Sequence, residues 1–85
     1  MERQTPAGRR VRIPDYAQRR LAQRGIGVEE VMRVLADPTT VEPSRDAPER
    51  WVERRTVRGR RLVVVTEREG VRPGVIVVVT AWIAE

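Results

Sequence analysis

The chain has neither cysteine nor histidine, and each absence excludes a class of chemistry. Without cysteine it can form no disulfide, no thiolate metal site and no cysteine nucleophile. Without histidine it lacks the commonest general base, and the two absences together remove most transition-metal sites. No apolar run approaches the roughly eighteen residues that span a bilayer, and the first residues lack the apolar segment of a signal peptide. We therefore expect a soluble, cytoplasmic protein with no metal, no cofactor and no membrane contact.

Lysine is also absent, so arginine supplies all the positive charge of the side chains. Seventeen arginines against twelve acidic residues give a formal net charge of +5 in 85 residues. Seven arginines lie in residues 1–24 with only two acids, and six more lie in residues 50–61 with one glutamate. Guanidinium groups match phosphate geometry, so two such clusters indicate a polyanionic partner. The alternative interpretation is that arginine merely fills the exposed basic positions of a lysine-free chain.

Hydrophobic periodicity predicts two helices followed by strands in a single small domain. Residues 1–13 show little periodicity and are expected to form a flexible basic arm, in which the alternating residues 10–13 offer a short edge strand. Helices are expected from residue 15 up to Gly25 and from residue 28 up to Asp37, where residue types typical of helix ends occur. Strands are expected at residues 39–42, 51–58, 62–66 and 75–82. The expected fold is α+β over residues 14–85, with two N-terminal helices packed on an antiparallel meander sheet of three to four strands.

Two of the expected strands are apolar on both faces. Neither Val63–Val65 nor Val75–Val79 alternates between apolar and polar residues. Two small helices cover only one face of a sheet, so something else should cover the other face. We expect a second copy of the chain, a partner protein or the N-terminal arm in that place.

The run from Asp15 to Ile26, continued through Pro38, resembles the domain of unknown function 4258 family. The pattern of that family is roughly H-A-x-x-R-[ML]-x-x-R-G-I-[ST]-x-x-[ED]-V. The residues that fall in register with it include Arg20, Arg24, Gly25 and Ile26. The segment Val78–Trp82 is similar to the V-x-T-x-[YW] strand that closes the family's meander. Two positions depart from the pattern, because Tyr16 stands at the histidine and Gly27 at the serine that usually caps the second helix.

The resemblance implies a fold and an activity. Members of the family are assigned to the barnase–EndoU–colicin–RelE (BECR) class of metal-independent ribonuclease folds and occur in toxin–antitoxin and polymorphic-toxin proteins. A RelE-like, toxin-like endoribonuclease that an antitoxin protein neutralises is therefore the first hypothesis. The second is a catalytically inactive relative that binds RNA or only a partner. The third is a dimerisation module whose apolar strands form the interface of a homodimer.

Cleavage of an RNA phosphodiester needs a base for the 2′-hydroxyl, an acid for the leaving 5′-oxygen and cations that stabilise the phosphorane. We nominate two groups of residues: Tyr16, Arg20, Arg54 and Thr80 as catalytic, and Arg19, Arg24, Arg55 and Arg61 as binding RNA phosphates. Glu53 and Glu67 are the carboxylate alternatives for the proton steps. The competing interpretations are structural, with a packed ring for the tyrosine and solvated or capping roles for the arginines.

Two details limit these assignments. Arg54 and Arg55 are neighbours in an expected strand, so their side chains point to opposite faces and at most one of them joins a given site. Trp51 and Trp82 are able to stack on bases, but in a chain with three aromatic residues we assign both to the core.

Overall fold

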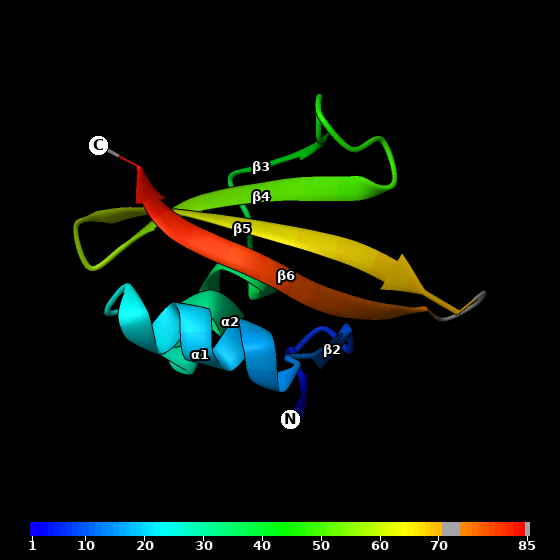
Figure 1. Ribbon diagram of the computed structural model, residues 1–85, viewed down its shortest axis with the longest axis horizontal. Helices are drawn as coiled ribbons and strands as arrows, with labels where there is room; N and C mark the ends of the chain where they lie inside the picture. Colours follow the sequence, from blue (N-terminus) through cyan, green and yellow to red (C-terminus); the bar gives the residue numbers. More distant parts are fainter. Residues whose placement is uncertain (71–73, 85) are drawn as a thin grey trace.

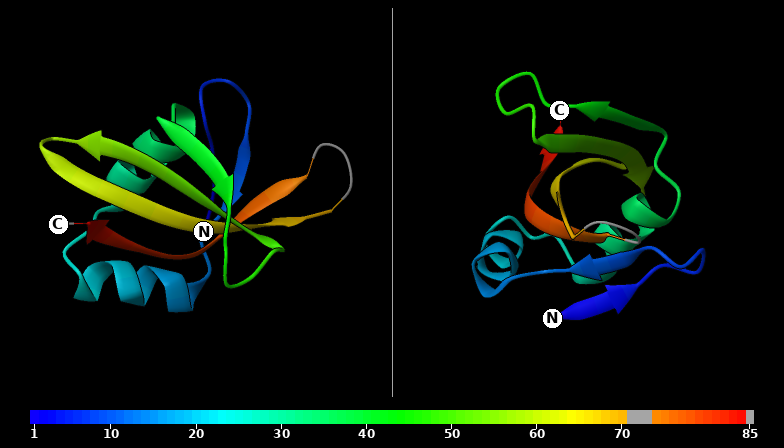
Figure 2. Two further views of the ribbon diagram at one scale, coloured as in Figure 1. Left: turned by 90° about the horizontal axis from the view of Figure 1, so that it is seen from above. Right: turned by 90° about the vertical axis from the view of Figure 1, so that its right-hand side faces the viewer.

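The computed structural model describes residues 1–70 and 74–84, which form two helices and a six-stranded sheet (Figure 1). In chain order the elements are β1 (Glu2–Gln4), β2 (Arg10–Arg12), α1 (Asp15–Gln23), α2 (Val28–Ala36), β3 (Thr40–Pro43), β4 (Arg50–Val57), β5 (Arg60–Glu69) and β6 (Val75–Ala84). Both helices lie on one face of the sheet (Figures 1 and 2). The two expected helices are therefore found, within one or two residues of their expected ends.

The sheet is larger and more mixed than the sequence pattern predicted. Its strand order is β1-β2-β6-β5-β4-β3, with four antiparallel pairs and a parallel pair between β2 and β6. The expectation of a RelE-like antiparallel meander of three to four strands that follows two N-terminal helices is thus wrong. Two of the additional strands come from residues 1–13, which were expected to form a flexible basic arm.

Long-range pairing explains why local pattern did not reveal this arrangement. Alternation at residues 10–13 indicated a short edge strand but not its partners, and the three residues of β1 are too few to show a period of two. β2 obtains its partners elsewhere, because it pairs with β1 on one side and with Val75–Val77 of β6 on the other. Its apolar side chains then enter the core, where Val11 and the following Ile13 are completely buried. The segment is held by tertiary contacts rather than by its own propensity.

The main core lies between the helices and the sheet. Ala17 and Leu21 of α1 and four residues of α2 are buried there, as the helical period of their sequences requires. Their partners on the sheet come from β4, β5 and β6 and include Leu62, Val64 and Val78. Gly25, in the left-handed conformation with a φ of 68°, allows the chain to leave α1 and begin α2 three residues later.

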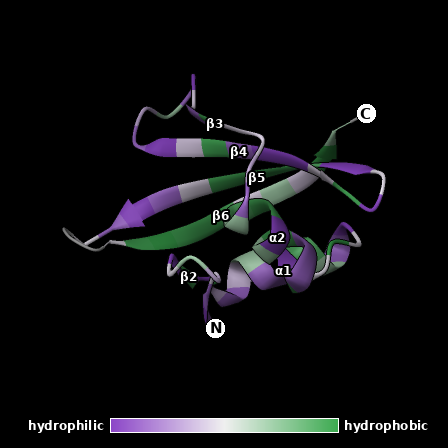
Figure 3. Ribbon diagram, turned by 180° about the vertical axis from the view of Figure 1, so that it is seen from behind, coloured by the Kyte–Doolittle hydropathy of each residue, from purple (hydrophilic) through white to green (hydrophobic). Residues whose placement is uncertain are grey.

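The opposite face of the sheet has an apolar floor of its own. The floor consists of four valines that cluster apart from the main core: Val52, Val63, Val65 and Val79. The non-alternating valine runs thus do face both ways, and Figure 3 shows hydrophobic residues along most of β6. The floor valines are only 3–9% exposed although no helix among the described residues covers them. A register shift between Val65 and Thr66 adds twist, and the sheet curves strongly (Figure 2).

Candidate nucleic-acid interface

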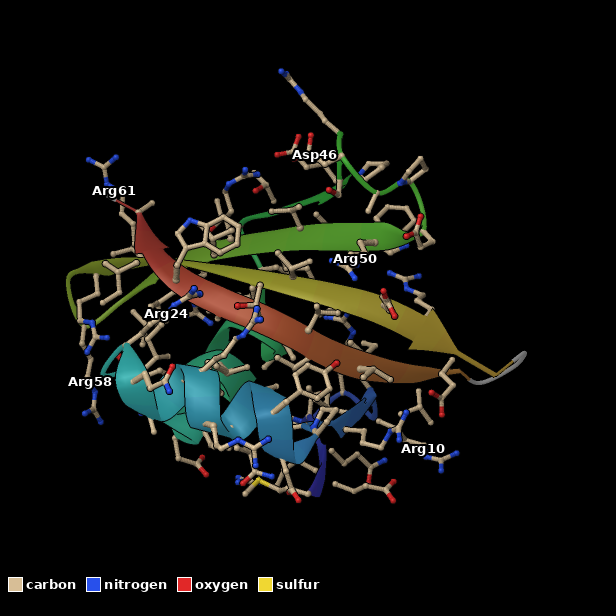
Figure 4. The ribbon with its side chains drawn as sticks, viewed as in Figure 1. Arg10, Arg24, Asp46, Arg50, Arg58 and Arg61 are labelled. Carbon is tan, nitrogen blue, oxygen red and sulfur yellow. The ribbon has the colours of Figure 1, made fainter. Side chains whose placement is uncertain are left out.

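Helix α1 lies beside the part of β6 that β2 leaves unpaired. β2 pairs only with Val75–Val77, and α1 runs alongside the remainder of β6 (Figures 1 and 2). Arg24, just after α1, joins the two elements, since its Nη1 donates hydrogen bonds to Thr80 Oγ1 at 3.0 Å and to the carbonyl oxygen of Ala81 at 2.7 Å. Figure 4 shows this side chain reaching from the end of α1 to β6. The carbonyl of Ala81, at an otherwise open edge of β6, thereby receives a hydrogen bond from the charged Arg24.

A polar stripe runs along α1 toward this contact. Tyr16, Arg20 and Arg24 follow one another at intervals of four residues, so they share one side of the helix. We call them the α1 stripe. Tyr16 is 46% exposed, so its side chain is partly accessible to a ligand. Arg20 is exposed and has no acidic partner among residues 1–70 and 74–84.

The stripe borders the sheet face that the helices do not cover, here called the open face. Strand register places three cross-strand rows on it: Arg54–Val63–Trp82, Val52–Val65–Thr80 and Arg50–Glu67–Val77. The rows combine cations from β4 with the valine floor on β5 and with Thr80 and Trp82 on β6. Since neighbouring strands are about 4.8 Å apart, the β4 arginines emerge about 10 Å from β6.

Carboxylates partly neutralise the arginines of β4. Arg50 Nε donates to Glu67 Oε1 at 2.8 Å, and Arg54 forms an ion pair with Glu42 of β3. The hydrogen bond to Glu67 is the main reason that the pKa of Arg50 lies above its ordinary value. The phenol of Tyr16 makes a minor contribution to the same rise in pKa. The α1 stripe joins the open face at the Val52–Val65–Thr80 row, through the hydrogen bond from Arg24 to Thr80.

The structure brings five of the eight nominated residues to this region and leaves three outside it. Tyr16, Arg20, Arg24, Thr80 and Arg54 lie on the α1 stripe or the open face. Arg19 lies on the side of α1 opposite the buried residues. Arg55 faces α2, where it donates to the carbonyl oxygen of Arg33 at 3.1 Å and lies 4.0 Å from Asp37. Arg61 lies at the end of the sheet and points away from Arg24 and Arg50 (Figure 4).

The two tryptophans differ from their expected roles. Trp82 was assigned to the core, but it is 39% exposed on the open face, so that assignment is wrong. Trp51 is half-buried on the helix side of the sheet, where the guanidinium of Arg68 lies 4.7 Å from the centre of its ring. Of the two, only Trp82 offers an aromatic surface on the open face.

Arg50 and Trp82 are the residues of this region that the nominated set lacks. The signal for Arg50 was present, because Arg50 and Arg54 are four residues apart in one strand and must face the same way. It was overlooked because the expected strand began at Trp51, whereas β4 begins at Arg50. The exposure of Trp82 could not be predicted from the sequence, because it depends on which face of the sheet the helices cover.

Comparisons with known proteins give one match. The family model for a domain of unknown function, DUF4258, matches residues 15–83. No curated protein and no solved structure matched the chain. Among the described residues, neither helix is long and apolar enough to cross a membrane, and the same residues include no group of three or more acidic side chains placed to hold a metal ion.

Proposed function

The chain belongs to the DUF4258 family, and we propose that it is a toxin-like, metal-independent endoribonuclease of the BECR class. The site would be the α1 stripe together with the adjoining open face. One observation carries the proposal: Tyr16, Arg20 and Arg24 line up on one side of α1, and Arg24 is hydrogen-bonded to Thr80 at the border of the open face. The proposal includes a cytoplasmic location, because that is where the protein would meet its RNA substrate.

The residues divide the chemistry as follows. Arg20 and Arg24 hold the scissile phosphate and stabilise the charge of the phosphorane, which arginine does without a change of protonation. Glu67 accepts the proton of the 2′-hydroxyl as its oxygen attacks phosphorus, and Tyr16 donates a proton to the departing 5′-oxygen. The products are a 2′,3′-cyclic phosphate and a 5′-hydroxyl end. Thr80 acts as a positioning residue, because its hydroxyl fixes the Arg24 guanidinium.

Glu53, the other carboxylate that the sequence offered, does not belong to this site. Its side chain is completely buried on the helix side of the sheet and is paired with Arg9. Glu67 is half-exposed on the open face beside Arg50, so it is the carboxylate that a substrate can reach.

A second candidate function is a catalytically inactive relative that binds RNA or a partner protein. It is favoured by the pairing of both β4 arginines on the open face with carboxylates, Arg50 with Glu67 and Arg54 with Glu42. Such pairing reduces the positive charge that is available to a phosphate. In either case the partner that covers the open face would be an antitoxin protein or a second copy of the chain, which are the two occupants that its valine floor suits.

The deciding experiment incubates the purified protein with end-labelled total RNA in EDTA, with and without ribosomes. We expect cleavage by the unaltered protein and by Arg19→Ala, a matched control that is turned about 100° from Arg20 on the same helix. Arg20→Ala and Tyr16→Phe should each reduce cleavage by about 10²-fold or more, with unchanged thermal unfolding. RNA that is bound but stays intact in every condition would reject the nuclease and leave the binding module.

A further inference from the structure

We propose that the open face contains a pocket for one unpaired nucleobase, with Trp82 as the surface on which the base stacks. This inference rests on the proposed RNA-directed function and names its substrate class as single-stranded RNA. The pocket has a volume of about 370 Å³, which lies within the range of about 300–1,000 Å³ typical of small-molecule sites. It lies between the β3–β4 loop and Trp82, above part of the valine floor.

The surfaces of the pocket suit the two faces of a base. Val52 and Val65 form an apolar bottom that is nearly closed to water, and Trp82 supplies an exposed aromatic side. Every base has an aromatic face that stacks on an indole, whereas a phosphate has none. The indole is 39% exposed on the open face, so its ring is accessible to a base.

The rim of the pocket suits the polar edge of a base and the backbone that follows it. Ser44 and Asp46 of the β3–β4 loop offer a hydroxyl and a carboxylate, both able to meet the donors on a base edge. Figure 4 shows Asp46 on the loop that stands above the sheet. Arg45 and Arg54 line the same rim. Arg45 supplies a cation for a flanking phosphate, whereas Arg54 is paired with Glu42, which also lines the pocket.

The pocket also lies at a suitable distance from the α1 stripe. Thr80, which holds Arg24, and Trp82 are two residues apart on the same face of β6, a separation of about 7 Å along the strand. A nucleotide whose phosphate meets Arg24 therefore has a base within reach of Trp82. A base inside a duplex is paired and stacked on both sides and cannot enter, so the pocket selects unpaired nucleotides.

The test uses a short 2′-O-methyl RNA, which lacks the nucleophile for cleavage, either single-stranded or annealed to its complement. Each variant keeps one tryptophan as the probe. In Trp51→Phe, where Trp82 remains, the single strand should quench the fluorescence, and the duplex should quench it far less. In Trp82→Phe, where Trp51 remains behind the sheet, neither should quench it. Affinity for the single strand should fall about 5- to 150-fold in Trp82→Leu and less in Trp82→Phe, which still stacks.

The outcomes separate this inference from the proposed function. Binding or cleavage of RNA that leaves Trp82 fluorescence unchanged, or that Trp82→Leu tolerates, would overturn the base pocket and leave the nuclease in place. Quenching of Trp82 with no cleavage of natural RNA would support the pocket and reject the nuclease. No binding of either strand form would overturn both.

Discussion

Arg9 holds the buried carboxylate of Glu53 through two parallel hydrogen bonds. Nη1 donates to Oε1 at 2.9 Å and Nη2 donates to Oε2 at 3.0 Å, and the Glu53 side chain is completely inaccessible to solvent. Arg9 Nη1 also donates to the carbonyl oxygen of Leu35 at the end of α2. The hydroxyl of Thr66 donates to Glu53 Oε2 at 3.3 Å. One guanidinium therefore ties the N-terminal segment to β4 and α2.

Removal of Arg9 should be far more costly than removal of an exposed arginine. Arg9→Met leaves the Glu53 carboxylate buried without a counter-charge, and we expect a loss of about 3–5 kcal/mol in the free energy of unfolding. Arg12→Ala breaks an exposed pair with Glu69 and should cost about 1 kcal/mol or less. Urea unfolding at low temperature measures both. The double variant Arg9→Met with Glu53→Leu should recover most of the loss, and no recovery would show that the ion pair is not the reason.

The turn between β4 and β5 contains a residue whose backbone strain a single substitution should relieve. Arg58 has a φ of 53° and Gly59 a φ of 78°, the signs that a two-residue type I′ hairpin turn requires. A side chain other than asparagine or glycine is disfavoured at positive φ. We expect Arg58→Asn to raise the free energy of unfolding by about 0.5–1 kcal/mol, measured by thermal or urea unfolding. Arg61→Asn, at a nearby strand position, should bring no gain, and an equal gain there would point to charge rather than backbone strain.

RNA affinity should depend on salt through the α1 stripe. Each phosphate contact on a single strand contributes about −0.7 to the slope of log K against log salt concentration. Arg20→Ala should make the slope less steep by about that amount, since Arg20 is exposed and has no acidic partner among the described residues. Arg19→Ala should change it less. Equal slopes for the two variants, measured by fluorescence anisotropy with a 2′-O-methyl RNA, would contradict the role of the stripe.

Thr80 offers a test of positioning that leaves the arginine in place. Thr80→Val keeps the shape of the side chain but removes the acceptor of the Arg24 hydrogen bond, while Arg24 keeps its bond to the carbonyl of Ala81. We expect cleavage to fall about tenfold, with KM affected more weakly than kcat, because the guanidinium is less well fixed in the transition state. Thr80→Ser should restore most of the activity. Full activity in the valine variant would remove Thr80 from the site.

Local sequence determined the elements whose signals are contained in a few consecutive residues. The helical period of apolar residues fixed α1 and α2, and Gly59 allows the positive φ that the β4–β5 turn requires. The period of two in a strand separated Arg54 from Arg55, which the structure places on opposite faces. These features depend only on backbone geometry, so they are readable before the chain is folded.

Tertiary structure decided the features that join distant segments. The parallel pairing of β2 with β6, the ion pair of Arg9 with Glu53 and the bond from Arg24 to Thr80 connect residues 44 or more positions apart. Hydrophobic periodicity does not reveal such contacts, because the polar groups of the two partners meet only after the sheet has formed. The exposure of Trp82 has the same cause: its strand is apolar on both sides, and only the placement of the helices on one face left the indole on the other.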